Sequence, residues 1–496
     1  MNSPTVVVVG AGPTGLATAV GLRLAGVSVR LLDKAPGPAA TSRALGLQPR
    51  GAEVLDRLGA LADLPERSVR IGQVLTHVDG KPLARLRVGQ PTKLVTRPGL
   101  LISQADVEAR LRARLATLGV DVEWGSELLG AGQDGERVRL RLADREIHSD
   151  WLVGCDGAHS RVRKAAGIAF PGVPVVERFL LADVTAKLPV PRDTVAVWLR
   201  GDRMLGAFPL PGEDLWRLMA PAPAGTDDDP LPVLCDLLAQ EAGITSPVVR
   251  EAHWTSTFRI HRRLASTYRK GRILLAGDAA HIHSPFGGQG MNTGLGDAEN
   301  LAWKLALVAT GRAGEGMLDT YEAERRPVAA EVLKSTSAMT GMLLGRTRWA
   351  RTLRDHVFVP LLGRPLVQRL LWEKSSQLTL TYRTGPLGGA PYGRGPRPGD
   401  RVPDLACTRA DGTSTRLYGE LPARWVLLIP GGGMAGEWEA VAGRHLGAGS
   451  VATLRAPGAH RGDSVLVRPD GHLTWRGASS ADLDQALTRI LVNGRQ

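Results

Sequence analysis

The chain carries the sequence GDAAHIHSPFGGQGMN at residues 277–292, and this stretch decides how the rest is interpreted. It follows the apolar run 273–276, typical of a buried strand, and leads into a helical pattern over residues 295–308. Glycines let a backbone approach a ligand closely, and a helix start has free N–H groups and a partial positive charge. A strand that ends at Gly277 and Asp278 before such a loop is therefore suited to a phosphate-bearing cofactor whose hydroxyl groups donate to Asp278.

A second glycine pattern, GAGPTG, occupies residues 10–15, between a strand pattern at 5–9 and a small, apolar helical pattern at 16–25. A further strand pattern at 28–32 ends at an acidic residue roughly 20 positions after the glycines, as in dinucleotide-binding folds. In such a turn the first glycine permits the tight bend, the second admits a diphosphate, and the third allows close helix–strand contact. The predicted nucleotide-binding residues are Gly10, Gly12, Pro13, Thr14, Gly15, Asp33 and Lys34.

The nucleotide at this turn could be NAD or FAD. A third strand pattern, at residues 151–154, stops at Cys155, Asp156 and Gly157. A dehydrogenase needs neither this element nor the segment at 277–292, whereas a flavin needs additional elements around its ribityl chain and ring. The three strand-end elements together therefore favour a flavin.

Composition limits the possible partners. The 496 residues allow two or three domains, and the formal net charge is +13. Acidic residues interleave with the arginines and no run of five basic residues occurs, so the charge does not favour nucleic-acid binding. A positive field would instead attract anionic NAD(P)H or a phenolate. No cysteine and histidine cluster has zinc-ligand spacing, so no metal is expected.

The sequence predicts a cytoplasmic protein without a membrane partner. Its three cysteines are widely separated, which is typical of a reducing compartment. No apolar run is long enough to cross a bilayer, and the first strand pattern starts too early for a secretory signal.

The predicted secondary structure divides the chain into several units. An α/β pattern covers residues 1–170 and 271–385, and Pro327 is expected to mark a helix break or start. A strand-rich unit over 171–270 is expected to include residues 70–100, and a linker at 386–400 precedes a last unit at 401–496. Five residues of the strand-rich unit could line an aromatic pocket but are more typical of a core: Trp198, Phe208, Trp216, Met219 and Phe258.

The motifs resemble those of the FAD-dependent aromatic hydroxylases of the p-hydroxybenzoate hydroxylase type, the class A flavoprotein monooxygenases. The glycine fingerprint, the Asp-Gly pair at 156–157 and the Gly-Asp pair at 277–278 occur in the family's order, and the helix at 297–304 continues the match. The linker and last unit resemble the branch that modifies polycyclic aromatic polyketides and antibiotics. The resemblance implies a Rossmann-like FAD-binding domain (1–170 and 271–385), an inserted mixed-sheet substrate domain (70–100 and 171–270), and a thioredoxin-like C-terminal domain (401–496).

The resemblance also assigns residues. It places Arg43 near the flavin and diphosphate, Gln104 against FAD, and Asp156 with Gly157 in contact with FAD and NAD(P)H. Gly277 and Asp278 correspond to the ribityl or phosphate contacts. The loop beside the flavin ring supplies Pro285, Gly288, Gly290, Met291 and Asn292, with the backbone N–H groups of the last two facing the ring's pyrimidine edge.

Two further pairs of residues each allow two interpretations. His281 and His283 could act as bases, although a role in bracing the loop is favoured. Arg161 and Arg163 could support nucleotide phosphates or simply lie at the surface.

The activity implied by the resemblance is hydroxylation of a phenolic, polycyclic substrate with NAD(P)H and O₂, through a flavin C4a-hydroperoxide. Pro285 and Arg43 are the candidate catalytic residues, and no side chain is assigned as the base. Baeyer–Villiger oxygenation, antibiotic inactivation and a non-catalytic flavin-binding role are the alternatives. A flavin halogenase is disfavoured because its Trp-x-Trp-x-Ile-Pro segment is absent. The oligomeric state stays open.

Overall fold

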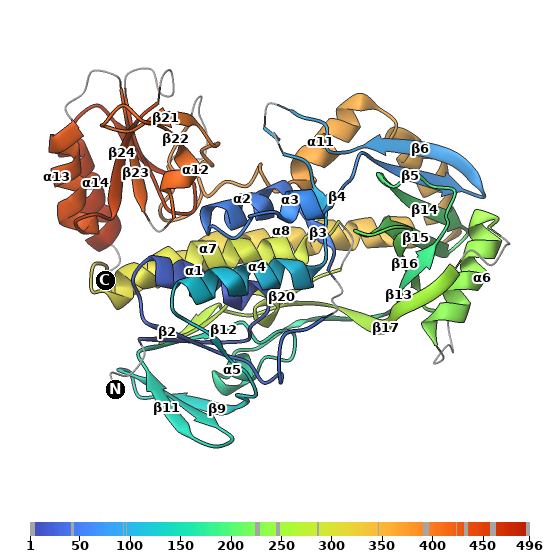
Figure 1. Cartoon of the computed structure of the whole chain (residues 1–496), viewed down its shortest axis with the longest axis horizontal. Helices are drawn as coiled ribbons and strands as arrows, with labels where there is room; N and C mark the ends of the chain where they lie inside the picture. Colours follow the sequence, from blue (N-terminus) through green and yellow to red (C-terminus); the bar gives the residue numbers. More distant parts are fainter. Residues whose placement is uncertain are drawn as a thin grey trace.

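The computed structural model of the chain places an α/β unit at the centre, an eight-stranded sheet at one end and a smaller α/β unit at the other (Figure 1). It describes residues 5–40, 44–92, 94–95, 97–223, 229–244, 249–284, 287–345, 347–389, 396–422, 424–430, 435–456 and 463–492.

The central sheet has the strand order β18-β19-β12-β1-β2-β8. Its strands are β18 (Arg269–Lys270), β19 (Ile273–Leu275), β12 (Trp151–Gly154), β1 (Val6–Val9), β2 (Val29–Leu32) and β8 (Val122–Glu123). All neighbours except β18 and β19 pair in parallel. Every residue of β1, β12 and β19 is buried, as expected for parallel strands covered on both faces.

Helices of the α/β unit pack tightly on one another. The main ones are α1 (Pro13–Leu24), α2 (Pro49–Arg57), α4 (Gln104–Thr117) and α7 (Gly290–Ala309). Helices α1 and α7 confirm the helical patterns predicted at residues 16–25 and 295–308. A Cβ atom at Gly21 of α1 would lie 2.7 Å from the Cβ atom of Ala302 of α7, so a glycine is needed where these helices touch.

The second large sheet has the order β20-β17-β13-β16-β15-β14-β5-β6. Its strands are β5 (Gln73–Val78), β6 (Lys81–Arg87), β13 (Gly172–Ala186), β14 (Thr194–Arg200), β15 (Arg203–Pro209), β16 (Leu215–Pro221), β17 (Val249–Leu264) and β20 (His281–Ile282). Residues 73–87 therefore join this sheet, where β5 pairs in parallel with β14. One face packs on helix α6 (Pro230–Ala242).

The opposite face of this sheet packs on the long helix α8 (Asp319–Leu344). The expectation that Pro327 breaks or starts a helix is wrong, because Pro327 lies inside α8. An internal proline costs about 3 kcal/mol. Buried ion pairs of Glu324 and Arg325 just before it, and the buried Ala329 just after it, hold the helix in place on both sides of Pro327.

Shorter elements complete these two units. They are β3 (Gly46–Leu47), α3 (Leu64–Arg67), β4 (Val69–Arg70), β7 (Leu100–Leu101), β9 (Leu128–Gln133), β10 (Val138–Leu142), β11 (Glu146–Ser149), α5 (Arg161–Ala165), η1 (Gly277–Ala279), η2 (Glu315–Leu318), α9 (Arg348–Leu353), η3 (Arg354–Phe358), α10 (Val359–Leu361) and α11 (Pro365–Ser375).

The C-terminal unit contains the sheet β22-β21-β24-β23-β25-β26. Its elements are β21 (Ala406–Thr408), β22 (Ser414–Arg416), α12 (Leu417–Glu420), β23 (Trp425–Ile429), α13 (Ala435–Leu446), β24 (Val451–Arg455), β25 (Ser464–Val467), β26 (Leu473–Gly477) and α14 (Ser480–Val492). The parallel pair β23 and β24 flanks α13, and the antiparallel strands β25 and β26 precede α14, in a thioredoxin-like arrangement. The only cysteine of this unit is Cys407, so it cannot perform dithiol chemistry.

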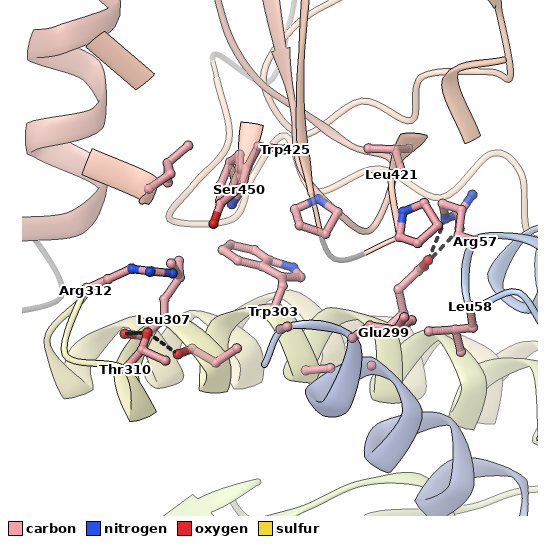
Figure 2. Close-up of a pocket in the computed structure, with 18 residues that line it drawn as sticks. Arg57, Leu58, Glu299, Trp303, Leu307, Thr310, Arg312, Leu421, Trp425 and Ser450 are labelled. Carbon is pink, nitrogen blue, oxygen red and sulfur yellow. Dashed lines mark hydrogen bonds and ion pairs between the residues drawn. The ribbon is translucent and has the colours of Figure 1, made fainter. Parts of the chain in front are cut away.

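The C-terminal unit docks on the α/β unit through buried side chains. Trp303 of α7 meets Trp425 of β23 edge to face, with ring centroids 5.2 Å apart (Figure 2). Beside them Arg57 donates to Glu299 at 2.6 and 3.0 Å. A cavity of about 60 Å³ lies at this interface, away from the glycine motifs.

Charged groups of the turn before β26 are buried at the same interface. Arg468 donates to Glu324 of α8 at 2.8 and 3.1 Å, and to Asp470 at 3.0 and 2.7 Å. His472, which has no exposed surface, lies 3.3 Å from the Asp470 carboxylate. Burial lowers the pKa of His472 to about 4, although Asp470 opposes the shift.

No helix among the described residues is long and apolar enough to span a membrane.

We expect acid to destabilise the fold partly through His472. Folded His472 stays neutral down to about pH 4, whereas an unfolded histidine takes up a proton near 6.5. The unfolded chain binds more protons in this window, so the free energy of unfolding falls as pH falls from about 6.5 to 4. Calorimetry of His472→Gln should show a smaller loss of Tm between pH 7.5 and 5 than the wild type. The exposed-site control His148→Gln should keep the wild-type slope.

Candidate functional site

Three separate motifs meet at one edge of the central sheet. The strands β1, β12 and β19 are parallel neighbours, so their carboxyl ends lie together, which is where open α/β sheets bind ligands. A Cβ atom at Gly10 would lie 2.4 Å from the carbonyl oxygen of Cys155. A Cβ atom at Gly277 would lie 2.5 Å from the Oγ1 atom of Thr14, and a Cβ atom at Gly294 would lie 2.3 Å from the same atom. The sequence motifs are therefore in direct contact.

The first glycine turn has the predicted geometry. Gly10 has a φ of +104°, which L side chains rarely adopt, and a Cβ atom at Gly15 would lie 1.8 Å from the carbonyl oxygen of Gly10. Gly12 differs, because a Cβ atom there would meet nothing within 4 Å. Gly12 is also the N-cap of α1, which starts at Pro13 without a side-chain cap or an acidic residue in its first turn. The three glycines thus serve two purposes. Gly10 and Gly15 shape the turn, and Gly12 leaves open space at a helix start.

Asp33 and Lys34 follow β2 beside this turn. The Asp33 carboxylate accepts hydrogen bonds from the backbone N–H groups of Ala11, at 2.6 Å, and Ala35, at 2.8 Å. Lys34 is exposed. The predicted acid therefore lies at the glycine turn and contacts it directly.

The carboxylate of Asp156 serves the protein itself. It accepts hydrogen bonds from the Ser160 hydroxyl at 2.5 Å and from the backbone N–H groups of Arg161 and Val162 at 2.6 and 3.1 Å, at the start of α5. Gly157 has a φ of +75° and open space at its Cβ position. Contact of this pair with a cofactor stays a prediction.

Arg163 connects the Asp156 motif to the Asp278 motif. It is buried, and it donates to the carbonyl oxygens of Ala279 at 2.8 Å and Ala158 at 2.9 Å. A surface role is therefore wrong for Arg163, whereas Arg161 is exposed.

Asp278 is the acidic group left accessible at this edge. Gly277 has a φ of +60°, which turns the chain after β19. The Asp278 side chain is exposed, and no donor among the described residues bonds to its carboxylate. Its protein surroundings nevertheless remove enough water to raise the pKa of Asp278, an effect that the field of Asp297 reinforces and His281 opposes. Among the described residues, the Asp278 carboxylate is thus an acceptor without a hydrogen-bond donor.

Asp297 is a functional-site residue that the sequence did not reveal. It has no exposed surface. One carboxylate oxygen accepts from the backbone N–H of Gly277 at 3.1 Å and from His281 Nε2 at 2.6 Å, and the other accepts from Arg325 Nε at 2.7 Å. Although burial opposes it, Arg325 and His281 lower the pKa of Asp297. No signal in the sequence separates Asp297 from the other polar residues of α7, such as Glu299 and Asn300.

The two histidines brace this segment. The contact of His281 with Asp297 confirms that interpretation for His281. His283 Nδ1 donates to the Ser284 carbonyl oxygen at 2.9 Å, and its ring stacks on that of His281 with centroids 6.3 Å apart. Burial lowers the pKa of His283 to about 4, so it is neutral near pH 7.

Asn292 fixes the glycine loop to the N-terminal segment. Its side-chain nitrogen donates to the carbonyl oxygens of Gly46 at 2.9 Å and Gly288 at 2.7 Å, and its oxygen accepts from the Gln48 backbone at 2.9 Å. Met291 is buried beside it. Gly290 is the first residue of α7, which has no side-chain cap and no acidic residue in its first turn. A second helix therefore starts uncapped at the site.

Three sequence-predicted residues are not placed by these contacts. Gln104 is the first residue of α4, and its amide donates to Glu108 at 2.8 Å. Arg43 and Pro285 lie outside the described residues. Within the described part of the chain, no cluster of three potential metal ligands occurs.

Comparison with known proteins identifies the family. Residues 3–336 match the FAD binding domain model, and residues 395–493 match the C-terminal domain of aromatic-ring hydroxylases. The chain is 35% identical to 6-methylpretetramide 4-monooxygenase of Streptomyces rimosus, over 97% of this chain and 92% of that protein. It is 36% identical to rifampicin monooxygenase of Streptomyces venezuelae, over 98% and 97% of the two chains. Among solved structures, CabE, an aromatic hydroxylase from angucycline biosynthesis, is 33% identical with a TM-score of 0.81 over 99% of both chains.

The chain therefore belongs to the FAD-dependent aromatic-ring hydroxylases, as its motifs predicted. It is a flavoprotein monooxygenase, and FAD is its cofactor. The geometry fits this cofactor: two uncapped helix starts offer N–H groups to anionic parts, and the Asp278 carboxylate, which has no donor among the described residues, offers an acceptor to hydroxyl groups.

We expect Asp297→Asn to destabilise the protein strongly. The substitution leaves the buried guanidinium of Arg325 without its counter-charge, at a cost of about 3–5 kcal/mol. Thermal unfolding measures the effect. The control is Asp319→Asn, which removes an exposed carboxylate from its pair with Arg269 and should cost no more than about 1 kcal/mol. Equal losses in the two variants would contradict the structural role of Asp297.

Proposed function

We propose that the protein uses NAD(P)H and O₂ to hydroxylate a phenolic, polycyclic aromatic compound of the polyketide type. The observation that carries this proposal is the convergence at one sheet edge of two uncapped helix starts and the Asp278 carboxylate, which has no donor among the described residues. The eight-stranded sheet adds an apolar face that meets α8. Relatives whose names specify polyketide and antibiotic substrates support the substrate class.

Each segment of the site contacts a different part of FAD in this proposal. The glycine turn at residues 10–15 binds the diphosphate, Asp33 and Lys34 face the adenosine end, and Gly277 with Asp278 binds the ribityl region. The start of α7 lies at the ring through Gly288, Gly290, Met291 and Asn292. Arg43, Gln104, Asp156, Gly157 and Pro285 are assigned to the cofactor from the sequence resemblance alone.

The substrate face belongs to the eight-stranded sheet. Of the five aromatic-pocket candidates, Trp198 and Trp216 pack against α6 on the far face. Met219 packs with Phe208 and Phe258 on the face that meets α8. These apolar side chains suit a planar aromatic substrate and exclude water from it.

The chain's own residues perform orientation, charge stabilisation and exclusion of water. Bound FAD, reduced by NAD(P)H, supplies the electrons that activate O₂ for transfer to the substrate. The start of α7 stabilises negative charge at the flavin ring by about 0.3–1 kcal/mol, or more where it is buried. Neither His281 nor His283 is placed to remove the phenolic proton, because His281 is engaged by Asp297 and the pKa of His283 is about 4.

A second candidate is modification of an antibiotic, including Baeyer–Villiger oxygenation. The 36% identity to a rifampicin monooxygenase favours it. The reacting cofactor and its binding residues are the same in both candidates, and the outcome depends on which substrate carbon faces the flavin. The cytoplasmic location stays a prediction.

Products formed under ¹⁸O₂ distinguish these activities. Purified holoenzyme is incubated with NADH or NADPH and a panel of polycyclic phenols and rifamycins, and products are analysed by mass spectrometry. Hydroxylation predicts a product that gains one ¹⁸O atom on an aromatic carbon. A lactone or ring-opened product indicates Baeyer–Villiger chemistry. Substrate-stimulated NAD(P)H oxidation that yields only hydrogen peroxide across the panel would contradict the proposal.

Gly12→Ala should separate binding from folding. The Cβ atom meets no protein atom and the backbone φ is −73°, so Tm should change little. The methyl group would enter the diphosphate space, so the FAD dissociation constant, measured by flavin fluorescence, should rise about tenfold or more. The control Gly443→Ala adds a methyl group to open space on α13 and should leave FAD affinity unchanged. Unaltered affinity in Gly12→Ala would exclude this turn as the diphosphate site.

A further inference from the structure

A continuous line of buried polar contacts joins the C-terminal unit to the FAD site. Its first part is the turn before β26, where Arg468 bonds to both Asp470 and Glu324. Arg468 and Glu324 have no exposed side-chain surface, and Asp470 is 2% exposed. Asn300 of α7 donates to Glu324 at 2.7 Å and to Asp470 at 3.2 Å. The turn is therefore fixed to α7 and α8 together.

Tyr382 lies between this turn and Arg325, the residue of α8 that follows Glu324. Its ring centroid is 4.4 Å from that of His472, and the guanidinium of Arg468 lies 5.3 Å from its ring centroid. Its backbone N–H donates to the Gly399 carbonyl oxygen at 2.8 Å, and the Gly399 N–H donates to Leu473 at 2.7 Å. Tyr382 is thus fixed to the C-terminal unit through both its ring and its backbone.

The hydroxyl group of Tyr382 reaches Arg325. It accepts a hydrogen bond from Arg325 Nη1 at 2.9 Å. The same guanidinium donates from Nη2 to the Thr293 carbonyl oxygen at 2.9 Å and from Nε to Asp297 at 2.7 Å. Arg325 is 3% exposed, so all three contacts are shielded from water.

Asp297 completes the line. Its other carboxylate oxygen accepts from Gly277 and from His281, the residues on either side of Asp278 in the segment assigned to FAD. Adjacent residues of α8 therefore face two ways: Glu324 pairs with the C-terminal unit, and Arg325 pairs with the base of the Asp278 segment.

Stability alone does not account for this construction. Well-packed apolar side chains can often replace a buried ion network without loss of stability, whereas hydrogen bonds fix directions as well as distances. The apolar part of the interface, around Trp303 and Trp425, already joins the two units. The interface also holds a second buried polar cluster, in which Arg401 and Tyr418 bond to Glu53 of α2. The line through Tyr382 and Arg325, in contrast, reaches Asp297.

We propose that the C-terminal unit positions the Asp278 segment for FAD, with Tyr382 and Arg325 as positioning residues that act through Asp297. This inference rests on the proposed assignment of Asp278 to the flavin. It gives the C-terminal unit, which has no dithiol of its own, a defined task in cofactor binding.

The test is Tyr382→Phe in the full-length protein. The substitution removes the acceptor of Arg325 and keeps the ring against His472. Hydrogen–deuterium exchange of the protein without FAD should accelerate in residues 277–282, where the Gly277 amide loses support. The FAD dissociation constant should rise about three- to tenfold, and the visible absorption bands of bound FAD should shift.

The matched control is Tyr418→Phe. Tyr418 is equally buried at the same interface, and its hydroxyl contacts Glu53 and the Val402 carbonyl oxygen rather than Arg325. It should lower Tm without altering exchange at 277–282, FAD affinity or the flavin spectrum. The inference would be overturned if both variants changed these three readouts in the same proportion to their loss of Tm. It would also be overturned if Tyr382→Phe behaved like the wild type. Failure of the wild type to bind FAD would instead overturn the flavin assignment itself.

Discussion

The buried carboxylate of Asp297 is the contact on which the geometry of the site depends. A charge without access to water requires a counter-charge and hydrogen-bond donors to compensate for its lost hydration. Asp297 obtains them from Arg325 of α8, from Gly277 in the turn that follows β19, and from His281 of β20. The chain therefore cannot satisfy this group unless those segments are already together. The contacts of Asp297 that hold these segments together in the fold therefore also form the site.

The second constraint is close approach at the carboxyl edge of the central sheet. Thr14 packs against Gly277 and Gly294, so the starts of α1 and α7 lie on the same side of the sheet. Neither helix start carries a cap or an acidic residue, which leaves its partial positive charge available. An elongated anionic cofactor fits such an arrangement better than a compact one, because the starts of α1 and α7 can each bind a separate part of the cofactor.

Much of the fold was predictable because it depends on local patterns. Buried parallel strands, the glycine turn and the first turns of α1 and α7 each have a signature a few residues long, and their order along the chain specified the family. Pro327 shows where local reasoning fails. Its propensity indicates a break, but α8 continues through it and forms ion pairs through Glu324 and Arg325 with groups far away in the sequence.

The sequence by itself determined where the chain turns and where helices begin, since those properties follow from glycine, proline and apolar spacing. It also identified Asp156 and Asp278 as acids at strand ends. Only the tertiary structure decided their use: Asp156 accepts hydrogen bonds from the first two N–H groups of α5, while Asp278 keeps its carboxylate accessible. The structure also revealed Asp297 as the residue that joins the segments. The physical reason is that a carboxylate's role depends on which donors the fold brings within about 3 Å, and no local pattern records that.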